Sequence, residues 1–335
     1  MKHNNISIFI PHQGCNHACS FCNQNTISGT QKQPTPQDVT EILTQLIDII
    51  KNKADTEIAF FGGSFTAINR QYMLSLLEAA NEFVGDDKFF GIRISTRPDA
   101  IDDEILSILK QYNVTSIELG AQSMCDDVLT LNNRGHFASD VVNASKLIKE
   151  YGFSLGLQMM VGLYGDTVNG AYFTASEIAK IMPDTVRIYP TVILKGTKLG
   201  ALYLSGEYKV MSLETAVCLC ADLLSFFKEN KIKVIKLGLH ASNDVEADML
   251  GGIYHPAFKE LCENKIYLQK AVEILLNHNS PNVIIYVKLG NVSKMVGQKK
   301  INIEKLSHMG YNVKVMEKKE LNDYEIIVKD VQDCY

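Results

Sequence analysis

Three cysteines near the start of the chain are spaced like the ligands of a metal ion or cluster. Cys15, Cys19 and Cys22 form the pattern Cys-x3-Cys-x2-Cys. A closed zinc site and an ordinary ferredoxin cluster both require four protein ligands, so three thiolates leave one position open. A 4Fe-4S cluster with one such open iron can bind a small molecule there and supply reductive chemistry. The alternative is a zinc loop that His12 or His17 completes.

The composition is that of a globular protein without a strong charge field. The 335 residues are 46% hydrophobic and 21% charged, and the net charge is −5. Residues 281–335 carry 9 Lys and 7 acids, a net charge of +2. Apolar runs stay well below the roughly 18 residues of a membrane helix, and the N-terminus lacks signal-peptide features, so we expect a cytoplasmic protein with no membrane contact. The clustering of three of the eight cysteines favours metal binding or catalysis over disulfides.

Short β-rich runs alternate with longer amphipathic segments through the first 240 residues. Strands are expected at 6–10, 57–61, 89–95, 116–119, 154–159 and 185–189, with a further one at 233–237. Helical periodicity is expected at 37–51, 71–84, 102–111, 139–151, 169–181 and 213–230. Such alternation predicts an α/β fold with a parallel sheet, here a partial (β/α)6 barrel.

Three regions follow from this pattern. We expect a barrel core over 1–240, a helical connector over 241–280 and a small C-terminal α+β unit over 281–335. The last region has strands at 283–287, 313–315 and 325–328 and one helix at 292–309.

The unusual residues of the core fall just after its expected strands. The cysteines follow the first strand, Gly62, Gly63 and Ser64 follow the second, and Gln122 follows the fourth. The carboxyl ends of parallel strands lie on one rim, where α/β barrels hold their active sites. These residues are therefore expected to converge.

The motifs resemble those of the radical S-adenosylmethionine (SAM) superfamily. The signature is CNHACSFC at 15–22, and FFGGS at 60–64 is similar to that family's Gly-Gly-acid motif, with Ser64 where many members have Glu or Asp. The resemblance implies that Cys15, Cys19 and Cys22 ligate a 4Fe-4S cluster whose open iron binds SAM. It also implies that Gly62, Gly63 and Ser64 hold the amino group of SAM.

The motifs further resemble the radical SAM core of the catalytic subunit of Elongator, which modifies the wobble uridine of tRNA at carbon 5. The similarity covers roughly residues 6–210, and part of it is shared with oxygen-independent coproporphyrinogen oxidase-like enzymes. By this resemblance Ser95, Gln122 and Arg134 would contact SAM, and a guanidinium suits its carboxylate. The motifs concerned are IRISTRPDAI (92–101), IELGAQSMCDDVL (117–129), NNRGH (132–136), MMVGL (159–163) and RIYPTVILKGTKL (187–199).

The chain is expected to differ from Elongator outside this core. We expect it to lack the acetyltransferase-like domain that binds acetyl-CoA and the basic N-terminal tRNA-binding segment. Residues 292–315 resemble a KH module, whose Gly-x-x-Gly loop clamps a nucleic-acid backbone. Here the loop is Gly297-Gln-Lys299-Lys300, and its two lysines would contact phosphates. A plain βαββ appendage with solvated lysines is the alternative.

These expectations define a function. The chain is predicted to be a radical SAM enzyme that cleaves SAM reductively to a 5′-deoxyadenosyl radical, which abstracts hydrogen from a substrate in tRNA. A reductant such as flavodoxin or ferredoxin would be its partner. The alternatives are a radical SAM enzyme that acts on a small molecule, as coproporphyrinogen oxidase does, and a non-catalytic protein that binds the cluster or SAM.

Overall fold

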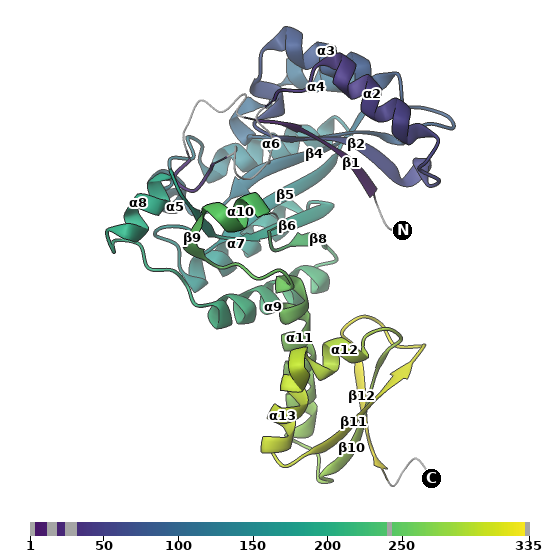
Figure 1. Ribbon diagram of the computed structural model, residues 1–335, viewed down its shortest axis with the longest axis vertical. Helices are drawn as coiled ribbons and strands as arrows, with labels where there is room; N and C mark the ends of the chain where they lie inside the picture. The colour runs from purple at the N-terminus through teal and green to yellow at the C-terminus, as the bar shows by residue number, and fades with distance from the viewer. Residues whose placement is uncertain (1–3, 12–18, 24–31, 240–242, 332–335) are drawn as a thin grey trace. The chain divides into compact units, whose positions relative to one another are not determined.

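The computed structural model describes residues 4–11, 19–23, 32–239 and 243–331, which divide into two compact units (Figure 1). The first unit comprises Met1–Met211 and Phe227–Tyr254. The second comprises Ser212–Phe226 and His255–Tyr335.

The first unit is built on a parallel seven-stranded sheet whose strands run in the order β1-β2-β3-β4-β5-β6-β8. The expected α/β partial barrel is thereby confirmed, and the further strand expected at 233–237 is present as β8. The strands are β1 (Asn4–Ile10), β2 (Thr56–Gly62), β3 (Gly91–Thr96), β4 (Val114–Gln122), β5 (Ser154–Val161), β6 (Thr185–Pro190) and β8 (Lys233–Leu237).

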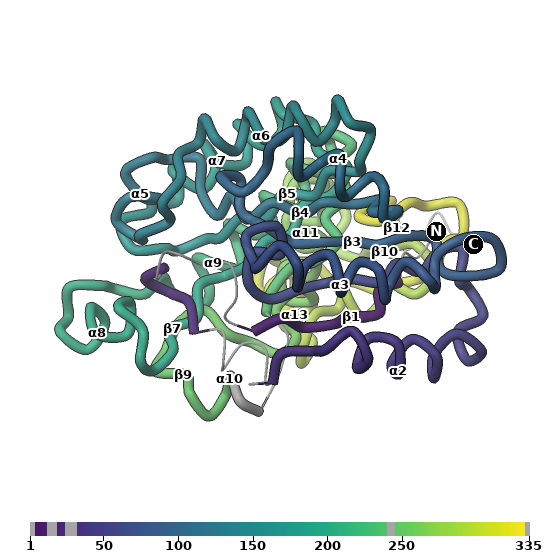
Figure 2. The backbone as a smooth tube through the Cα atoms, turned by 90° about the horizontal axis from the view of Figure 1, so that it is seen from above, coloured from purple at the N-terminus to yellow at the C-terminus, as the bar shows by residue number. Residues whose placement is uncertain are grey.

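Helices connect successive strands and cover one face of the sheet, as Figure 2 shows for α4, α6 and α7. Side-chain caps fix several helix starts: Thr35 begins α2 with a capping box, and Asp102 and Thr167 cap α4 and α7. The helices are α2 (Pro36–Ile47), α3 (Arg70–Asn81), α4 (Asp103–Gln111), α5 (Asp126–Leu131), α6 (Ala138–Glu150), α7 (Val168–Ile181), α8 (Lys198–Leu204) and α10 (Asn243–Asp248). Most of α9 (Leu213–Glu229) belongs to the second unit.

A small antiparallel pair, β7 (Val192–Leu194) with β9 (Met249–Gly252), accompanies the sheet. The sequence pattern did not predict it. Its strands have only three and four residues, too few for an alternation of polar and apolar side chains to stand out.

The two faces of the large sheet differ in character. The face under the helices is apolar, and its side chains include Ile58, Ile92, Ile117, Leu155 and Ile188, all 0% exposed. The opposite face carries charged and polar residues at alternate positions of the same strands. Because successive side chains of a strand point to opposite faces, one set forms the core and the other lines the concave side of the partial barrel.

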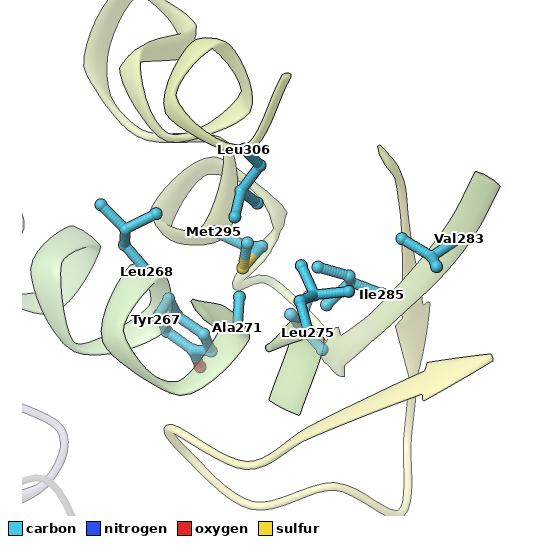
Figure 3. Packing of buried hydrophobic residues seen from close by; sticks show 9 residues of the cluster. Tyr267, Leu268, Ala271, Leu275, Val283, Ile285, Met295 and Leu306 are labelled. Carbon is cyan, nitrogen blue, oxygen red and sulfur yellow. The ribbon is translucent and has the colours of Figure 1, made fainter. Parts of the chain in front are cut away.

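The second unit packs helices on one face of a three-stranded sheet of order β11-β10-β12. Leu268 and Leu275 of the first helix, Met295 of the second and Leu306 of the third meet Ile285 of the central strand in one core (Figure 3). The elements are α11 (Phe258–Leu275), β10 (Asn282–Lys288), α12 (Val292–Val296), α13 (Ile301–His308), β11 (Asn312–Lys318) and β12 (Ile326–Asp330).

The single helix expected over 292–309 is in fact two helices. Gly297 has φ +78°, and Lys299 and Lys300 take left-handed backbone conformations with φ of 52° and 65°. Three departures from helical geometry within four residues end α12 and start α13. From β10 to β12 the order of helices and strands is therefore β-α-α-β-β, with the predicted lysine pair in the turn between the helices.

Within the described part of the chain, no helix is both long enough and apolar enough to cross a membrane.

Candidate functional site

The carboxyl ends of β1 and β2 are joined by the glycine pair. Gly62 has φ +114°, and a Cβ built on it would lie 2.4 Å from the carbonyl oxygen of Ile10. The next amide, of Gly63, donates a hydrogen bond of 2.9 Å to the same oxygen. Only glycine fits the position of Gly62, because any side chain would strike the end of β1. The pair therefore holds the last turn of β1, just before the cysteine segment begins.

Ser64 joins the ends of β2 and β3. Its hydroxyl lies 3.0 Å from Thr96 Oγ1 and accepts a 3.0 Å hydrogen bond from the Arg97 amide. The side chain is 1% exposed and its hydroxyl is engaged within the protein. A contact between this side chain and a cofactor stays a prediction.

Arg134 brings the cysteine segment to the end of β4. Its Nη1 donates to Cys19 Sγ at 3.1 Å, and its Nη2 donates to the Gly120 carbonyl at 2.7 Å. Arg134 is 6% exposed, and it contacts no carboxylate among the described residues. A buried guanidinium needs an anionic partner. A cysteine thiolate or the carboxylate of a bound molecule would supply that charge.

Asn132 fixes the backbone of the cysteine segment. The Ser20 amide and hydroxyl donate to the Asn132 carbonyl and Oδ1 at 3.0 and 2.6 Å. The Asn132 side-chain amide donates to the carbonyls of Val128 and Tyr164, both at 2.8 Å. Asn132 is fully buried, so it links the cysteine segment to the end of α5 and to the turn after β5.

The other side of the segment is held by the turn that starts α8. The Leu199 amide donates to the Ser20 carbonyl at 2.7 Å, and Phe21 packs against Ile193, Leu199 and Tyr208. Asn132 belongs to the NNRGH motif, and no role was predicted for it from the sequence. The feature that could have identified Asn132 was its amide side chain, two residues before the expected SAM ligand Arg134.

Several buried polar atoms at this rim have no hydrogen-bond partner among the described residues. They are Ser95 Oγ, Gln122 Oε1, Arg134 Nε and His136 Nδ1. Buried polar groups are normally satisfied, and a cluster of unpaired ones indicates a place for a ligand with polar groups of its own. Gln122 also has φ +65° at a register shift between β4 and β5, which turns the chain at the strand end.

His136 is held neutral beside Arg134. Burial, together with the positive charge of Arg134, lowers its pKa to about 4. Its Nε2 lies 3.3 Å from the Ala121 carbonyl, which can only accept, so the proton of the neutral ring sits on Nε2. The sequence analysis did not assign this residue, because a histidine in a loop has no periodic signal.

A second group of residues that the sequence analysis missed lies on the concave face. Arg93 Nε donates to Glu57 at 2.6 Å and its Nη1 donates to Glu118 at 2.9 Å, while Arg187 Nη2 donates to Glu118 at 2.8 Å. Glu57, Arg93 and Glu118 are 0, 4 and 1% exposed. The available signal was one charged residue within each of four otherwise largely apolar strands, β2, β3, β4 and β6. This network of two acids and two bases forms the polar floor below the rim.

The structure thus gathers Cys19, Gly62, Ser64, Gln122 and Arg134 at the ends of neighbouring strands, with Cys22 one turn further along the cysteine segment. Ser95 belongs to β3 at the same edge. Cys15, His12 and His17 lie outside the described residues. Gly297, Lys299 and Lys300 belong to the second unit, where both lysines are exposed.

Two family models match the chain. The model for the radical SAM superfamily matches residues 9–175, and a radical SAM C-terminal domain model matches residues 183–268.

Curated relatives match the same region. An uncharacterized protein of Methanocaldococcus jannaschii is 36% identical over 138 residues, which are 40% of this chain and 43% of that protein. The tRNA uridine(34) acetyltransferase of Methanocaldococcus infernus is 28% identical over 60% of this chain and 38% of its own length. Human Elongator complex protein 3 is 32% identical over 50% of this chain and 35% of its own length. The chain thus matches less than half of each of these relatives.

Solved structures share the fold. Archaeal Elp3 of Methanocaldococcus infernus, lacking its N-terminal segment, superposes with a TM-score of 0.56 at 20% identity and covers 81% of this chain and 68% of that one. Coproporphyrinogen III oxidase of Escherichia coli gives a TM-score of 0.51 at 17% identity, over 68% of this chain and 53% of that one.

Proposed function

Since the chain belongs to the radical SAM superfamily, we propose that it is an enzyme that cleaves S-adenosylmethionine reductively at a 4Fe-4S cluster and modifies a tRNA base. The observation that carries the proposal is the contact of Arg134 with Cys19 at the rim of the sheet. It puts a predicted cluster ligand and a predicted SAM ligand side by side.

The residues present fit these groups. Cys19 and Cys22, with Cys15, would hold the cluster, and thiolates are the ligands that such clusters require. The unpaired atoms of Ser95, Gln122 and Arg134 offer two oxygens and an N–H group, a set that suits the ribose and carboxylate of SAM. When bound, the reduced cluster and SAM together supply a 5′-deoxyadenosyl radical that takes hydrogen from the substrate.

The chain's own residues position and shield this chemistry. Arg134 donates from two nitrogens toward the rim, and Asn132 and Leu199 hold the segment that carries the ligands. His136 stays uncharged, so it adds no second positive charge beside Arg134. Hydrophobic contacts around Phe21 keep water from the segment on the α8 side.

Two further parts of the proposal concern partners. The relatives named as tRNA uridine(34) acetyltransferase and Elongator complex protein 3 support tRNA as the substrate class. A one-electron reductant is also required, and we propose a flavodoxin or a ferredoxin. Because the chain spans less than half of those relatives, the acetyl transfer that their names describe is not part of this proposal.

The test is anaerobic. The cluster is reconstituted and reduced with dithionite, SAM is added, and 5′-deoxyadenosine is quantified with and without bulk tRNA. We expect release from the parent protein, stimulation by tRNA, and loss of both release and iron in Cys15→Ala, Cys19→Ala and Cys22→Ala.

Cys125→Ser is the matched control. Burial raises the pKa of the Cys125 thiol, and its Sγ lies 3.9 Å from the Gly170 carbonyl, within a segment distinct from the three ligands. This variant should keep its iron and its activity. Full release from Cys19→Ala would overturn the cluster assignment. Release that a porphyrinogen and not tRNA stimulates would replace RNA by a small-molecule substrate.

A further inference from the structure

Among the described residues, α11, α12 and α13 pack on one face of the second unit's sheet and leave the other face uncovered. Val283 and Ile285 of the central strand point into the core beneath α11, α12 and α13 (Figure 3), and Val287 belongs to the same core. Successive residues of a strand alternate between faces, so the intervening positions lie on the other side. We call this side the open face. Its positions are Asn282, Ile284, Tyr286 and Lys288 of β10, Asn312, Lys314, Met316 and Lys318 of β11, and Ile327 and Lys329 of β12.

The strand positions of the open face carry charges of one sign. Four of the ten are lysines and none is acidic. Lys288 is paired with Asp323 at 3.1 Å, whereas Lys314, Lys318 and Lys329 are exposed and form no ion pair among the described residues.

The two acids within these strands, Glu317 and Asp330, occupy positions of the opposite face, although Glu317 also lines the groove beside the open face. Glu317 accepts a hydrogen bond from the Gly290 amide at 2.9 Å, and Asp330 contacts His278 at 2.6 Å. Because side chains alternate along each strand, the strand lysines and the strand acids occupy positions of opposite faces, although residues 281–335 have a net charge of only +2.

The centre of the open face is apolar and aromatic. Tyr286 stands directly opposite Met316 on one side and Ile327 on the other. Ile284, in the next row, stands opposite Lys314 and Lys329, and it is 5% exposed. A half-buried ring is therefore framed by apolar side chains, with cations at the margins.

We propose that the open face binds single-stranded RNA, with Tyr286 as a stacking platform and Lys314, Lys318 and Lys329 as phosphate contacts. Proteins bind single strands in this way, by base stacking on exposed aromatic rings within a positively charged groove. A groove of ≈ 450 Å³ lies along the face, and its lining includes Tyr286, Lys318 and Lys329 together with Lys319, Glu317 and Glu320. This proposal rests on the RNA substrate proposed above.

Two observations favour RNA over an acidic protein segment. Lysines and an aromatic ring in one sheet face suit a ligand that has both anionic and flat apolar parts, which a nucleotide combines in a single unit. An acidic peptide that adds to a sheet would pair with an edge strand and not lie across three strands.

The experiment measures RNA binding by the full chain with its cluster reconstituted, under anaerobic conditions. Fluorescence anisotropy follows a labelled oligouridine of about twelve nucleotides, a length within the footprint of such sites. We expect Lys314→Glu with Lys329→Glu to weaken binding at least about tenfold and to reduce the slope of log K against log salt by roughly 1.4, about 0.7 per lost phosphate contact.

Substitutions of Tyr286 provide a second, independent test of the open face. Tyr286→Ala should weaken binding roughly five- to hundredfold, the range expected for loss of one stacked base, and leave the salt slope unchanged. Tyr286→Phe keeps the ring and should bind like the parent. Circular dichroism melts of each variant report whether the unit is still folded.

The turn between α12 and α13 supplies a matched control. Lys299→Glu with Lys300→Glu makes the same change in charge on the same unit, away from the open face. Equal loss from both pairs of variants, or loss only from the Lys299 and Lys300 pair, overturns the open-face proposal. So does binding that polyglutamate competes away as effectively as RNA does, because an acidic protein would then fit the face equally well.

The two proposals fail separately. The open face lies outside the rim site, so Lys314→Glu with Lys329→Glu should leave release of 5′-deoxyadenosine without RNA unchanged. RNA binding through the open face with no such release would disprove the proposed chemistry alone. If Lys314→Glu with Lys329→Glu still releases 5′-deoxyadenosine and binds RNA as the parent does, only the open-face proposal is disproved.

Discussion

Cys19 and Arg134 are 115 residues apart in the chain, yet Arg134 Nη1 lies 3.1 Å from Cys19 Sγ. The cysteine follows β1, at the edge of the sheet, and the arginine follows α5, after the fourth strand. Both residues are buried, so the contact ties the cysteine segment to the loop that follows α5.

Replacing Arg134 should impair SAM cleavage without unfolding the protein. Arg134→Ala removes a charged hydrogen-bond donor worth about 1.5–3 kcal/mol, so release of 5′-deoxyadenosine should fall roughly ten- to hundredfold. Arg134→Lys should restore little, because an ammonium group cannot reproduce the two-nitrogen fork. Lys146→Ala, at an exposed surface pair, is the control. Parental activity in Arg134→Ala would show that Arg134 only packs the cysteine segment.

Asn132→Ala should lower the iron content after reconstitution. It removes the acceptor of the Ser20 hydroxyl and the donor to two buried carbonyls, at a cost of about 1–3 kcal/mol for each group left unpaired. The cysteine segment would then lose its anchor. Iron per chain and the melting temperature check this expectation.

The neighbouring exposed residue offers a control for Asn132. Asn133 has φ +53°, so Asn133→Gly suits the backbone there and should keep both iron and stability. If Asn132→Ala binds as much iron as Asn133→Gly, the anchor is dispensable.

Glu118→Ala should strongly destabilise the first unit. Glu118 is 1% exposed and bonds both Arg93 and Arg187, so its loss leaves two buried cations without that partner. Breaking a buried pair costs about 3–5 kcal/mol, measured as the free energy of unfolding in urea. Glu104→Ala breaks an exposed pair with Arg70 and should cost less than about 1 kcal/mol. Equal losses from the two variants would contradict the role of the buried network.

His136 should make the folded state sensitive to acid. Its pKa falls from 6.5 to about 4 on folding, so between these values the unfolded chain binds more protons and stability is lost as the pH falls. The shift corresponds to about 3 kcal/mol, present at pH 7 and lost by about pH 4. Burial raises the pKa of Asp166 to about 6, which acts in the opposite direction.

The difference between the parent and His136→Asn therefore isolates the histidine. Urea unfolding at pH 7 and pH 5 should show a smaller acid loss in the variant than in the parent. An identical pH dependence of the two proteins would refute the assignment.

Much of the fold could be predicted because it is encoded locally. The alternation of apolar strands and amphipathic helices marked every strand of the large sheet, and β8 was predicted with its observed bounds, Lys233–Leu237. The short β7 and β9 carried no such pattern. The break between α12 and α13 at Gly297–Lys300 was not predicted either, and one helix was expected there. The break depends on backbone angles that lysines rarely adopt.

What the sequence determined by itself was a set of residues that could do chemistry: three clustered thiols, a glycine pair and an arginine motif, which follow β1, β2 and α5, so that a parallel sheet could bring them to one rim. Only the tertiary structure decided which of these residues contact one another. Asn132 becomes an anchor and His136 a neutral neighbour of Arg134 through burial and pairing between distant segments. The separation of lysines from acids on the two faces of the second sheet likewise exists only once strand register fixes which side each residue occupies.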